Sequence, residues 1–169
     1  DLNGCIVSDT INFTFNPLPR FELGVDTAIC EGESITFDGT SLAGATYEWN
    51  DGSMQSTLTT SVGGVYSLQA TLDGCIFIDT RNLRIKPLPL ADLGMDQVLC
   101  EEERFILDVT QIDASYTWQD GSTDSGFVVS QAGDYNVEVN LEGCIARDTV
   151  NFVFNPIPRF NLGADTVLC

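Results

Sequence analysis

A block of 27 residues occurs three times in this chain, and its spacing limits what the chain can fold into. The copies are GCIVSDTINFTFNPLPRFELGVDTAIC (4–30), GCIFIDTRNLRIKPLPLADLGMDQVLC (74–100) and GCIARDTVNFVFNPIPRFNLGADTVLC (143–169), with twelve positions identical in all three. Their starts are 70 and 69 residues apart, a spacing typical of a tandem array. We therefore expect several small units and not one domain of 169 residues.

Each block runs from a cysteine, through an alternating segment and a Pro-x-Pro sequence, to a second cysteine. In the first copy, Ile11, Phe13 and Phe15 alternate with polar residues, which predicts a strand. The prolines that follow end this strand, because proline cannot donate a hydrogen bond to a sheet. The block is thus interpreted as a junction between domains in a fragment of a longer protein. The predicted division is the last strand of a preceding repeat (1–16), two complete repeats (17–86 and 87–155) and the start of a following repeat (156–169).

The interior of each repeat predicts short strands joined by tight turns. Apolar residues alternate with polar ones from Tyr66 to Leu72, and Asp73-Gly74 then marks a turn. Asp51-Gly52 predicts another hairpin, with the strand of Trp49 on one side of it. No segment has the 3.6-residue period of a helix. The expected fold is all-β, a tandem of small β-sandwiches that form an elongated rod.

The net charge of −18, from 25 acidic and 7 basic side chains, excludes several classes of partner. It would repel nucleic acid and an anionic membrane surface, and no apolar run is long enough to span a bilayer. Because the chain has no histidine, Ser–His and Cys–His nucleophile pairs are impossible. We predict that the chain is not an enzyme, binds no nucleic acid, inserts in no membrane and needs no cofactor, with calcium as one open question.

Six cysteines, two per repeat, predict disulfides formed in an oxidising, extracellular compartment. Two pairings fit the spacing, one within each repeat and one across each proline joint. The joint pairing is disfavoured, because the intervening strand would hold Cys75 and Cys100 tens of ångströms apart, whereas a disulfide needs Cα atoms within about 7 Å. The within-repeat pairing requires Cys30 to lie at the same end of the sheet as the Asp73-Gly74 turn. The predicted bonds are Cys30–Cys75 and Cys100–Cys144, with Cys5 and Cys169 paired outside residues 1–169.

An aspartate in the sequence G-C-x-x-x-D-T shares a strand face with apolar residues, so its carboxylate needs partners. Hydrogen bonds from backbone amides are the favoured interpretation. The alternative is a calcium ion at the joint, shared with the aspartate of the L-G-x-D turn. The candidate residues are Asp9, Asp26, Asp79, Asp96, Asp148 and Asp165.

Four aromatic residues recur at matching places in the two complete repeats. Trp49 and Trp118 each follow a tyrosine by two residues, which permits a carbohydrate-stacking role. The favoured interpretation is a core tryptophan that packs on the disulfide of a sandwich. Tyr66 and Tyr135 follow glycines near strand starts and are predicted to be corner tyrosines.

The pattern C-x-G-x₅-D, Y-x-W-x-D-G-S, G-x-Y-x-V-x-V, G-C-x₃-D-T and N-P-x-P resembles repeats of very large surface proteins of the Bacteroidetes. These are PKD-like and immunoglobulin-like sandwiches, including those of gliding adhesins exported by type IX secretion. The resemblance covers the whole chain, with Glu102 and Gln97 as departures from it. It implies an exported tandem stalk or adhesin repeat. It also implies O-glycosylation at D-[S/T]-aliphatic sequences, here Thr10, Thr27, Thr149 and Thr166.

We therefore expect a structural stalk or filament segment of a large cell-surface adhesin, in which disulfide-stapled repeats act as a mechanical spacer. The first alternative is a self-assembling extracellular filament, in which copies of the same chain pack side by side. The second is a module that binds a glycan or a protein. In each hypothesis the adjacent repeats of the same chain are partners, and the filament adds other copies of the chain.

Overall fold

The computed structural model describes residues 8–40, 43–161 and 163. The chain forms two compact units, unit 1 (Asp1–Ile85) and unit 2 (Lys86–Cys169). The boundary between them lies one residue from the predicted boundary between the two complete repeats. The assignment of both chain ends to further, partial repeats stays a prediction.

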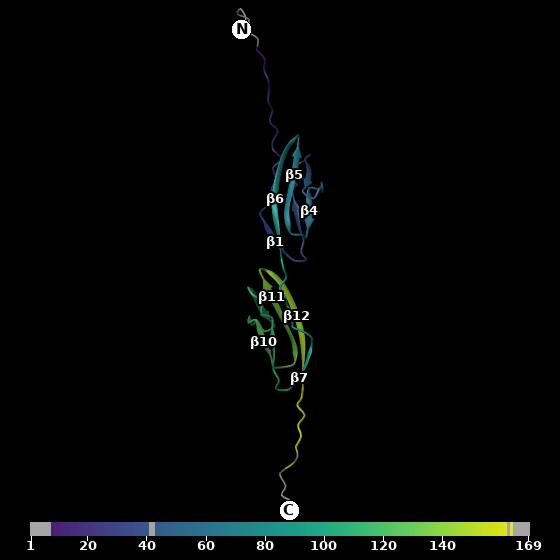
Figure 1. Ribbon diagram of the computed structural model, residues 1–169, viewed down its shortest axis with the longest axis vertical. Coiled ribbons are helices and arrows are strands. Elements are labelled where there is room, and N and C mark those ends of the chain that lie inside the picture. The colour runs from purple at the N-terminus through teal and green to yellow at the C-terminus, as the bar shows by residue number, and fades with distance from the viewer. Residues whose placement is uncertain (1–7, 41–42, 162, 164–169) are drawn as a thin grey trace, which may run out of the picture. The chain divides into compact units, whose positions relative to one another are not determined.

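The described residues of unit 1 form two sheets (Figure 1). The larger sheet has the strand order β1-β6-β5-β3, and the smaller sheet pairs β2 with β4. The strands are β1 (Thr27–Cys30), β2 (Ile35–Asp38), β3 (Thr46–Trp49), β4 (Thr57–Thr60), β5 (Gly64–Leu72) and β6 (Cys75–Lys86).

Unit 2 repeats this arrangement with the orders β7-β12-β11-β9 and β10-β8. Its strands are β7 (Gln97–Cys100), β8 (Phe105–Asp108), β9 (Ala114–Trp118), β10 (Gly126–Val129), β11 (Gly133–Leu141) and β12 (Cys144–Asn155). The predicted all-β class is confirmed. Among the described residues there is no helix, and hence none that is long and apolar enough to cross a membrane.

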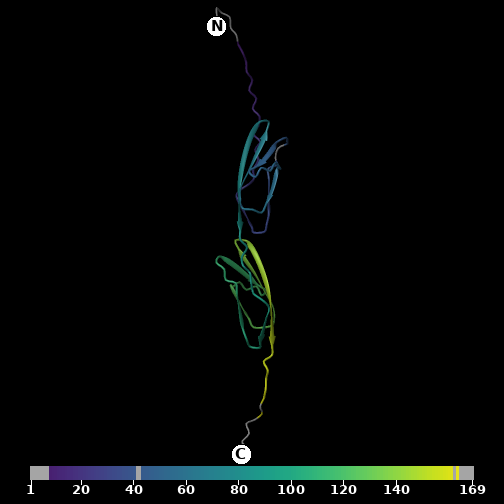
Figure 2. The same cartoon turned by 45° about the vertical axis from the view of Figure 1, so that its right-hand side comes forward.

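The longest strands of each unit form a β-hairpin with a two-residue turn, visible in both views (Figure 1, Figure 2). In unit 1, Leu72 pairs with Cys75 across Asp73 and Gly74, whose φ angles are 49° and 80°. Two consecutive positive φ angles define the turn that matches the twist of a hairpin, and Asp-Gly tolerates them. The hairpin predicted here from the sequence is therefore present.

The second predicted hairpin, at Asp51-Gly52, is different. The turn itself forms, with Gly52 at a φ of 84° and a hydrogen bond of 2.8 Å from Trp49 N to Ser53 O. However, β4 pairs with β2 and not with β3. The indole of Trp49 points into the core and donates to Gln55 O at 2.8 Å, which directs the chain over the core to the second sheet.

Each unit has its own hydrophobic core between its two sheets. In unit 1 the core joins Phe37 of the small sheet to Trp49, Leu68 and Leu83 of the large sheet. The rings of Phe37 and Trp49 lie 6.3 Å apart. Apolar contact between the sheets is what stabilises two sheets of this size, because neither is stable alone in water.

The predicted strand before Asn16 is not formed. Residues 8–26 contain no strand, and Phe13 and Phe15 are 75% and 94% exposed. The residues at the position of Phe13 in the other two blocks are Leu83 and Phe152, which are 2% and 1% exposed in β6 and β12. A strand needs a paired neighbour, and the described residues supply no strand to pair with this segment.

Candidate functional site: the paired end strands and the cysteines

The first and last strands of each unit are neighbours in the large sheet. In unit 2 the pairing is parallel, and its register places Phe152 opposite Gln97 and Asn155 opposite Cys100. The chain therefore enters each sheet beside the strand through which it leaves. We call β1 with β6, and β7 with β12, the end-strand pairs.

Aspartates fasten each end-strand pair to the chain that leads into it. In unit 2, the carboxylate of Asp148 on β12 accepts hydrogen bonds from Leu93 N at 2.6 Å and from Thr149 N at 2.8 Å. In return, Asp96 accepts a hydrogen bond from Asn151 N at 2.9 Å. We call the two aspartates of each unit, Asp79 with Asp26 and Asp148 with Asp96, the aspartate clamp.

Unit 1 makes the same clamp with an addition. Asp79 accepts a hydrogen bond from Leu23 N at 2.8 Å, and Asp26 accepts one from Asn82 N at 2.9 Å. In addition, Arg81 donates from its guanidinium to Leu23 O at 2.7 Å and lies over the ring of Phe37 at 5.2 Å. The clamp thus ties residues more than fifty positions apart in the chain.

The clamp contacts are those of the favoured, hydrogen-bonded interpretation of these aspartates. In the described part of the chain, no three acidic or cysteine side chains are placed to share a metal ion. Asp9 accepts a hydrogen bond from Thr10 N at 2.8 Å, and Asp165 lies outside the described residues. Calcium binding by these aspartates stays a hypothesis.

The predicted disulfides are wrong. Cys30 and Cys144 are disulfide-bonded, whereas Cys75 and Cys100 have free thiols, so neither Cys30–Cys75 nor Cys100–Cys144 is formed. The alternative bond between Cys75 and Cys100 is absent as well. Cys5 and Cys169 lie outside the described residues.

The direction of the end strands explains this error. The register places Cys100 beside Asn155, at the last residue of β12, whereas Cys144 is its first residue. Asn155 lies eleven positions after Cys144, roughly 36 Å away at about 3.3 Å per residue, far beyond the roughly 7 Å of a disulfide. In unit 1, Leu23 bonds to Asp79, and Asp26, three residues later, bonds to Asn82, also three residues later. The lead-in to β1 therefore runs in the same direction as β6. Cys30 therefore lies away from the Asp73-Gly74 turn and not beside it.

Two residues of the joint sequences contact the hairpin turns that join the longest strands. At the start of β6, the thiol of Cys75 donates to Asn16 O at 3.9 Å, and the side chain of Asn16 donates to Asp73 O at 3.4 Å. Lys86 stands at the position of Asn16 in the next block, and its ammonium group donates to the carbonyl oxygen of Glu142, in the Glu142-Gly143 turn of unit 2. The residue before each of the first two Pro-x-Pro sequences thus contacts the hairpin turn of the unit that it leads into.

The predicted core aromatics lie inside the sandwiches. Trp49 and Trp118 are both 2% exposed, and the indole of Trp118 donates to Asp124 O at 2.8 Å. A buried ring offers no stacking platform to a sugar. Tyr66 donates to Val62 O at 2.6 Å and Tyr135 donates to Gln131 O at 2.9 Å, the backward bond of a corner tyrosine. Trp49 packs on Phe37, and the within-repeat disulfide on which it was predicted to pack is not formed.

The glycosylation candidates differ in exposure. Thr10 and Thr149 are exposed, and Thr149 faces outward on β12. Thr27 is half-buried in β1, and Thr166 lies outside the described residues. Modification at these positions stays a prediction, which the intact mass of the protein purified from its natural source would test.

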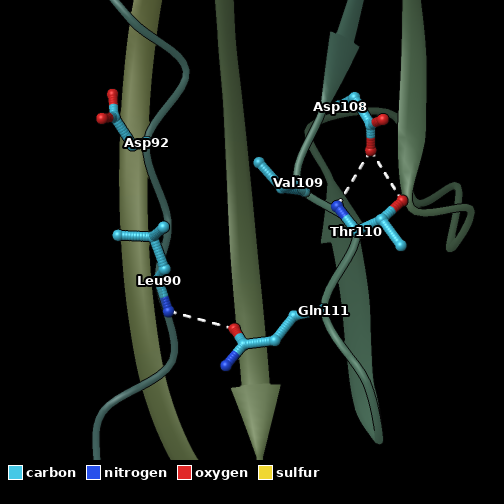
Figure 3. A pocket seen from close by; sticks show the side chains of 6 residues that line it. All are labelled: Leu90, Asp92, Asp108, Val109, Thr110 and Gln111. Carbon is cyan, nitrogen blue, oxygen red and sulfur yellow. Dashed lines mark hydrogen bonds between the residues drawn. The ribbon is translucent and has the colours of Figure 1, made fainter.

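A hollow of about 400 Å³ opens on unit 2 between the lead-in segment, residues 87–96 before β7, and the turn after β8 (Figure 3). Its polar groups are largely engaged with one another. Leu90 N donates to the side chain of Gln111 at 3.1 Å, and Asp108 accepts hydrogen bonds from the backbone and hydroxyl of Thr110 at 2.9 and 2.6 Å. The lining contains no aromatic side chain that could stack on a sugar.

Four exposed turn aspartates form a further set that the sequence analysis missed. In each, a residue two positions later donates hydrogen bonds to the carboxylate. For Asp108, the hydroxyl and then the backbone amide of Thr110 lower the pKa below its ordinary value of 3.8. The set comprises Asp38, Asp51, Asp108 and Asp120, all with a lowered pKa. The recurring D-x-[S/T] sequence was the available signal.

No family model matches the chain, and no curated protein matches it. Solved structures with a similar fold include the I67–I69 fragment of titin, at 17% identity and a TM-score of 0.42 over 78% of this chain and 63% of that one. The insect immune protein hemolin is 16% identical, with a TM-score of 0.47 over 87% of this chain and 49% of hemolin. Sidekick-1 immunoglobulin domains 1–5 are 12% identical, with a TM-score of 0.40 over 81% and 37%.

The chain thus spans less than two thirds of each of these solved chains, and similarity at this level carries no information on function. The architecture rests on the chain's own geometry. Each unit has two sheets packed around a buried tryptophan, with a corner tyrosine near the start of its hairpin. The chain is a tandem of small immunoglobulin-like β-sandwiches.

Proposed function

We propose that this chain is a load-bearing spacer segment of a large exported protein, in which tandem sandwiches transmit tension along the chain. The observation that carries the proposal is the parallel pairing of the first and last strands of a unit. In a tandem array, tension reaches each unit through its first and last strands, because these strands lead to the neighbouring joints.

Parallel neighbours that are pulled from opposite ends are loaded in shear. Tension draws β7 backward at its first residue and β12 forward at its last, so the hydrogen bonds between them are strained together. Strands pulled apart from one shared end lose their hydrogen bonds one at a time. Shear therefore gives the slower unfolding under force, and forced unfolding depends on that rate.

The aspartate clamp lies on the same load path. Asp148 holds Leu93 and Asp96 holds the amide of Asn151, so the lead-in cannot slide along β12 until both bonds break. Hydrogen bonds to a carboxylate are stronger than those between neutral groups. The same contacts recur at Asp79 and Asp26 of unit 1, as expected for a feature that each repeat of a spacer needs.

An exported location fits the disulfide-bonded state of Cys30 and Cys144, since such bonds persist in oxidising compartments. The high negative charge of −18 favours solubility at a cell surface. The surface adhesins of the Bacteroidetes that the repeats resemble are of this kind, and we propose the same setting for this chain.

Lateral packing into a filament is supported less well. A packing stripe should recur in each repeat, and Ile76 and Ile145 are exposed at equivalent places, at 53% and 40%. Most other exposed apolar residues on strands have no apolar equivalent in the other unit. The pairs are Val65 and Asp134, Val128 and Thr59, Ile106 and Thr36, Ile78 and Arg147, and Val153 and Arg84.

Single-molecule stretching of the chain under reducing conditions, in which no disulfide can carry tension past the strands, tests the proposal. Asp79→Ala removes a clamp residue from unit 1 and should lower the force of one of the two unfolding events. Unit 2, left unchanged, supplies the reference event in the same molecule. The matched control is Glu48→Ala, which removes an exposed carboxylate from β3, a strand outside the end-strand pair.

The two variants separate a load-bearing clamp from a general loss of stability. Asp79→Ala should lower the unfolding force, whereas Glu48→Ala should leave both events at the wild-type force. If Asp79→Ala lowers the melting temperature but leaves the unfolding force unchanged, the end-strand pair does not carry the load and the spacer proposal fails.

A further inference from the structure

The cysteines of this chain fall into two classes by their place in the sheet. Cys30 and Cys100 are the last residues of the first strands, β1 and β7, and form the first-strand class. Cys75 and Cys144 open the last strands, β6 and β12, and form the last-strand class. Among the four cysteines that the structure describes, each class has one bonded and one free member, since Cys30 and Cys144 are disulfide-bonded and Cys75 and Cys100 are free.

The first-strand class lies where the chain leaves a unit. Cys100 is opposite Asn155 in the register, and Glu101 N donates to Asn155 O at 2.8 Å. Asn155 is the residue immediately before a Pro-x-Pro sequence. The thiol of Cys100 is exposed, as a partner from outside the unit would require.

The last-strand class lies where the chain enters a unit. Asn16 is the residue before the first Pro-x-Pro sequence, and Cys75 contacts its carbonyl at 3.9 Å. Asn16 and Asn155 occupy the same position of the repeated block. The residue before Pro-x-Pro therefore lies beside two kinds of cysteine. One is the first-strand cysteine of the unit that the chain leaves, and the other is the last-strand cysteine of the unit that the chain enters.

We infer that disulfides join the first-strand cysteine of one repeat to the last-strand cysteine of the repeat that follows it. Cys100 would then bond to the last-strand cysteine of a following repeat, and Cys75 would bond to the first-strand cysteine of a preceding repeat. Neighbouring strands lie about 4.8 Å apart, so two cysteines that approach the same joint residue from one side have Cα atoms within the roughly 7 Å that a disulfide needs. The same rule gives Cys30 a partner of the last-strand class and Cys144 a partner of the first-strand class.

Each such bond forms by thiol–disulfide exchange with an oxidised disulfide donor, as oxidoreductases of export compartments provide. One cysteine attacks the donor as a thiolate, and the second cysteine then displaces the donor from the mixed disulfide. The two thiols lose two protons and two electrons, and the donor leaves as a dithiol. The result is a second covalent connection beside each Pro-x-Pro segment.

Extending the array by one period at either end tests this inference. In the first chain, a copy of residues 101–169 follows Cys169. In the second, a copy of residues 1–70 precedes Asp1. Both continue the repeat without a break in register. Each chain is produced in an oxidising compartment, alkylated with iodoacetamide without reduction, and mapped by mass spectrometry.

Both Cys75 and Cys100 should be alkylated in residues 1–169. The C-terminal extension should protect Cys100 alone and link it to the added cysteine that corresponds to Cys144. The N-terminal extension should protect Cys75 alone and link it to the added cysteine that corresponds to Cys30. Serine at either of these added cysteines should restore alkylation of the original residue.

Each extended chain is the control for the other, because each leaves one of the two thiols without its proposed partner. The inference is overturned if Cys100 stays alkylated after the C-terminal extension, or if it is linked to Cys75 or to another first-strand cysteine. Failure of this test would leave the spacer proposal standing, because the shear geometry does not depend on the disulfides.

Discussion

Asp148 and Leu93 lie 55 residues apart in the chain and are joined by a hydrogen bond of 2.6 Å from the Leu93 amide to the carboxylate. Leu93 is itself a core residue at 8% exposure. This bond therefore fixes a lead-in residue in the core against the last strand. Because Asp79 and Leu23 make the equivalent bond at 2.8 Å, the contact belongs to the repeat and not to one copy of it.

Removing that carboxylate should destabilise unit 2. Asp148→Ala leaves the amides of Leu93 and Thr149 without their acceptor. We expect a loss of about 1.5–3 kcal/mol in the free energy of unfolding, as for hydrogen bonds to charged groups. Chemical denaturation measures it. The control is Glu138→Ala, which removes an exposed ion pair with Arg147 and should cost less than about 1 kcal/mol. Equal losses for both variants would contradict a special role for Asp148.

Arg81 and Val150 occupy equivalent positions in the two units but differ in charge and in burial. Val150 is fully buried, whereas Arg81 is half-buried and its Nε has no hydrogen-bond partner among the described residues. Val150→Arg should therefore destabilise unit 2 by more than about 3 kcal/mol, because it buries a charge. Arg81→Val should cost less, since it trades one guanidinium bond to Leu23 O for relief of the unpaired Nε. Thermal melts of both variants give the comparison, and the opposite order would show that the guanidinium is essential to unit 1.

The turn aspartates predict a pH effect of defined sign. Hydrogen bonds from Thr110 lower the pKa of Asp108 in the folded protein below 3.8, so the unfolded chain binds a proton more readily. The stabilisation from the ionised Asp108 carboxylate is complete at pH values well above the unfolded pKa of 3.8. It is lost as the pH falls through the lower pKa of the folded protein. The difference in unfolding free energy between wild type and Asp108→Asn should stay constant above about pH 5 and shrink in acid. Asp113→Asn removes the same charge from an exposed loop and controls for the change in overall repulsion.

Calcium should not stabilise either unit. The clamp carboxylates already accept backbone hydrogen bonds, and the described residues contain no group of three acidic side chains arranged for an ion. Calcium sites need six to eight oxygen ligands. We expect the same melting temperature in EDTA and in millimolar calcium. A rise in calcium that Asp148→Asn abolishes would show that the clamp aspartates bind the ion.

The sequence predicted what depends on residues close together in the chain. The Asp73-Gly74 hairpin formed because that pair tolerates two positive φ angles wherever it lies. Trp49, Trp118, Tyr66 and Tyr135 adopt the core and corner positions that their spacing indicated. The favoured hydrogen-bonded role of the aspartates followed from the cost of an inward carboxylate without partners.

The sequence could not predict which strands meet. Asp51-Gly52 turns the chain as expected, yet the strand after it joins the other sheet, because the core around Trp49 and Phe37 must be closed by a second layer. The strand pattern before Asn16 was equally clear, and Phe13 and Phe15 are nevertheless exposed. A period-2 pattern states which face of a strand is apolar but not which neighbour covers it.

The sequence alone therefore determined the period of the array, its all-β class and the prolines that end β6 and β12. Only the tertiary structure decided the state of the cysteines. Spacing along the chain does not encode whether β7 runs with β12 or against it, and the parallel register places Cys100 at the far end of the strand that Cys144 begins. The direction of one short strand, set by the packing of two sheets, excludes the disulfides that the spacing favoured.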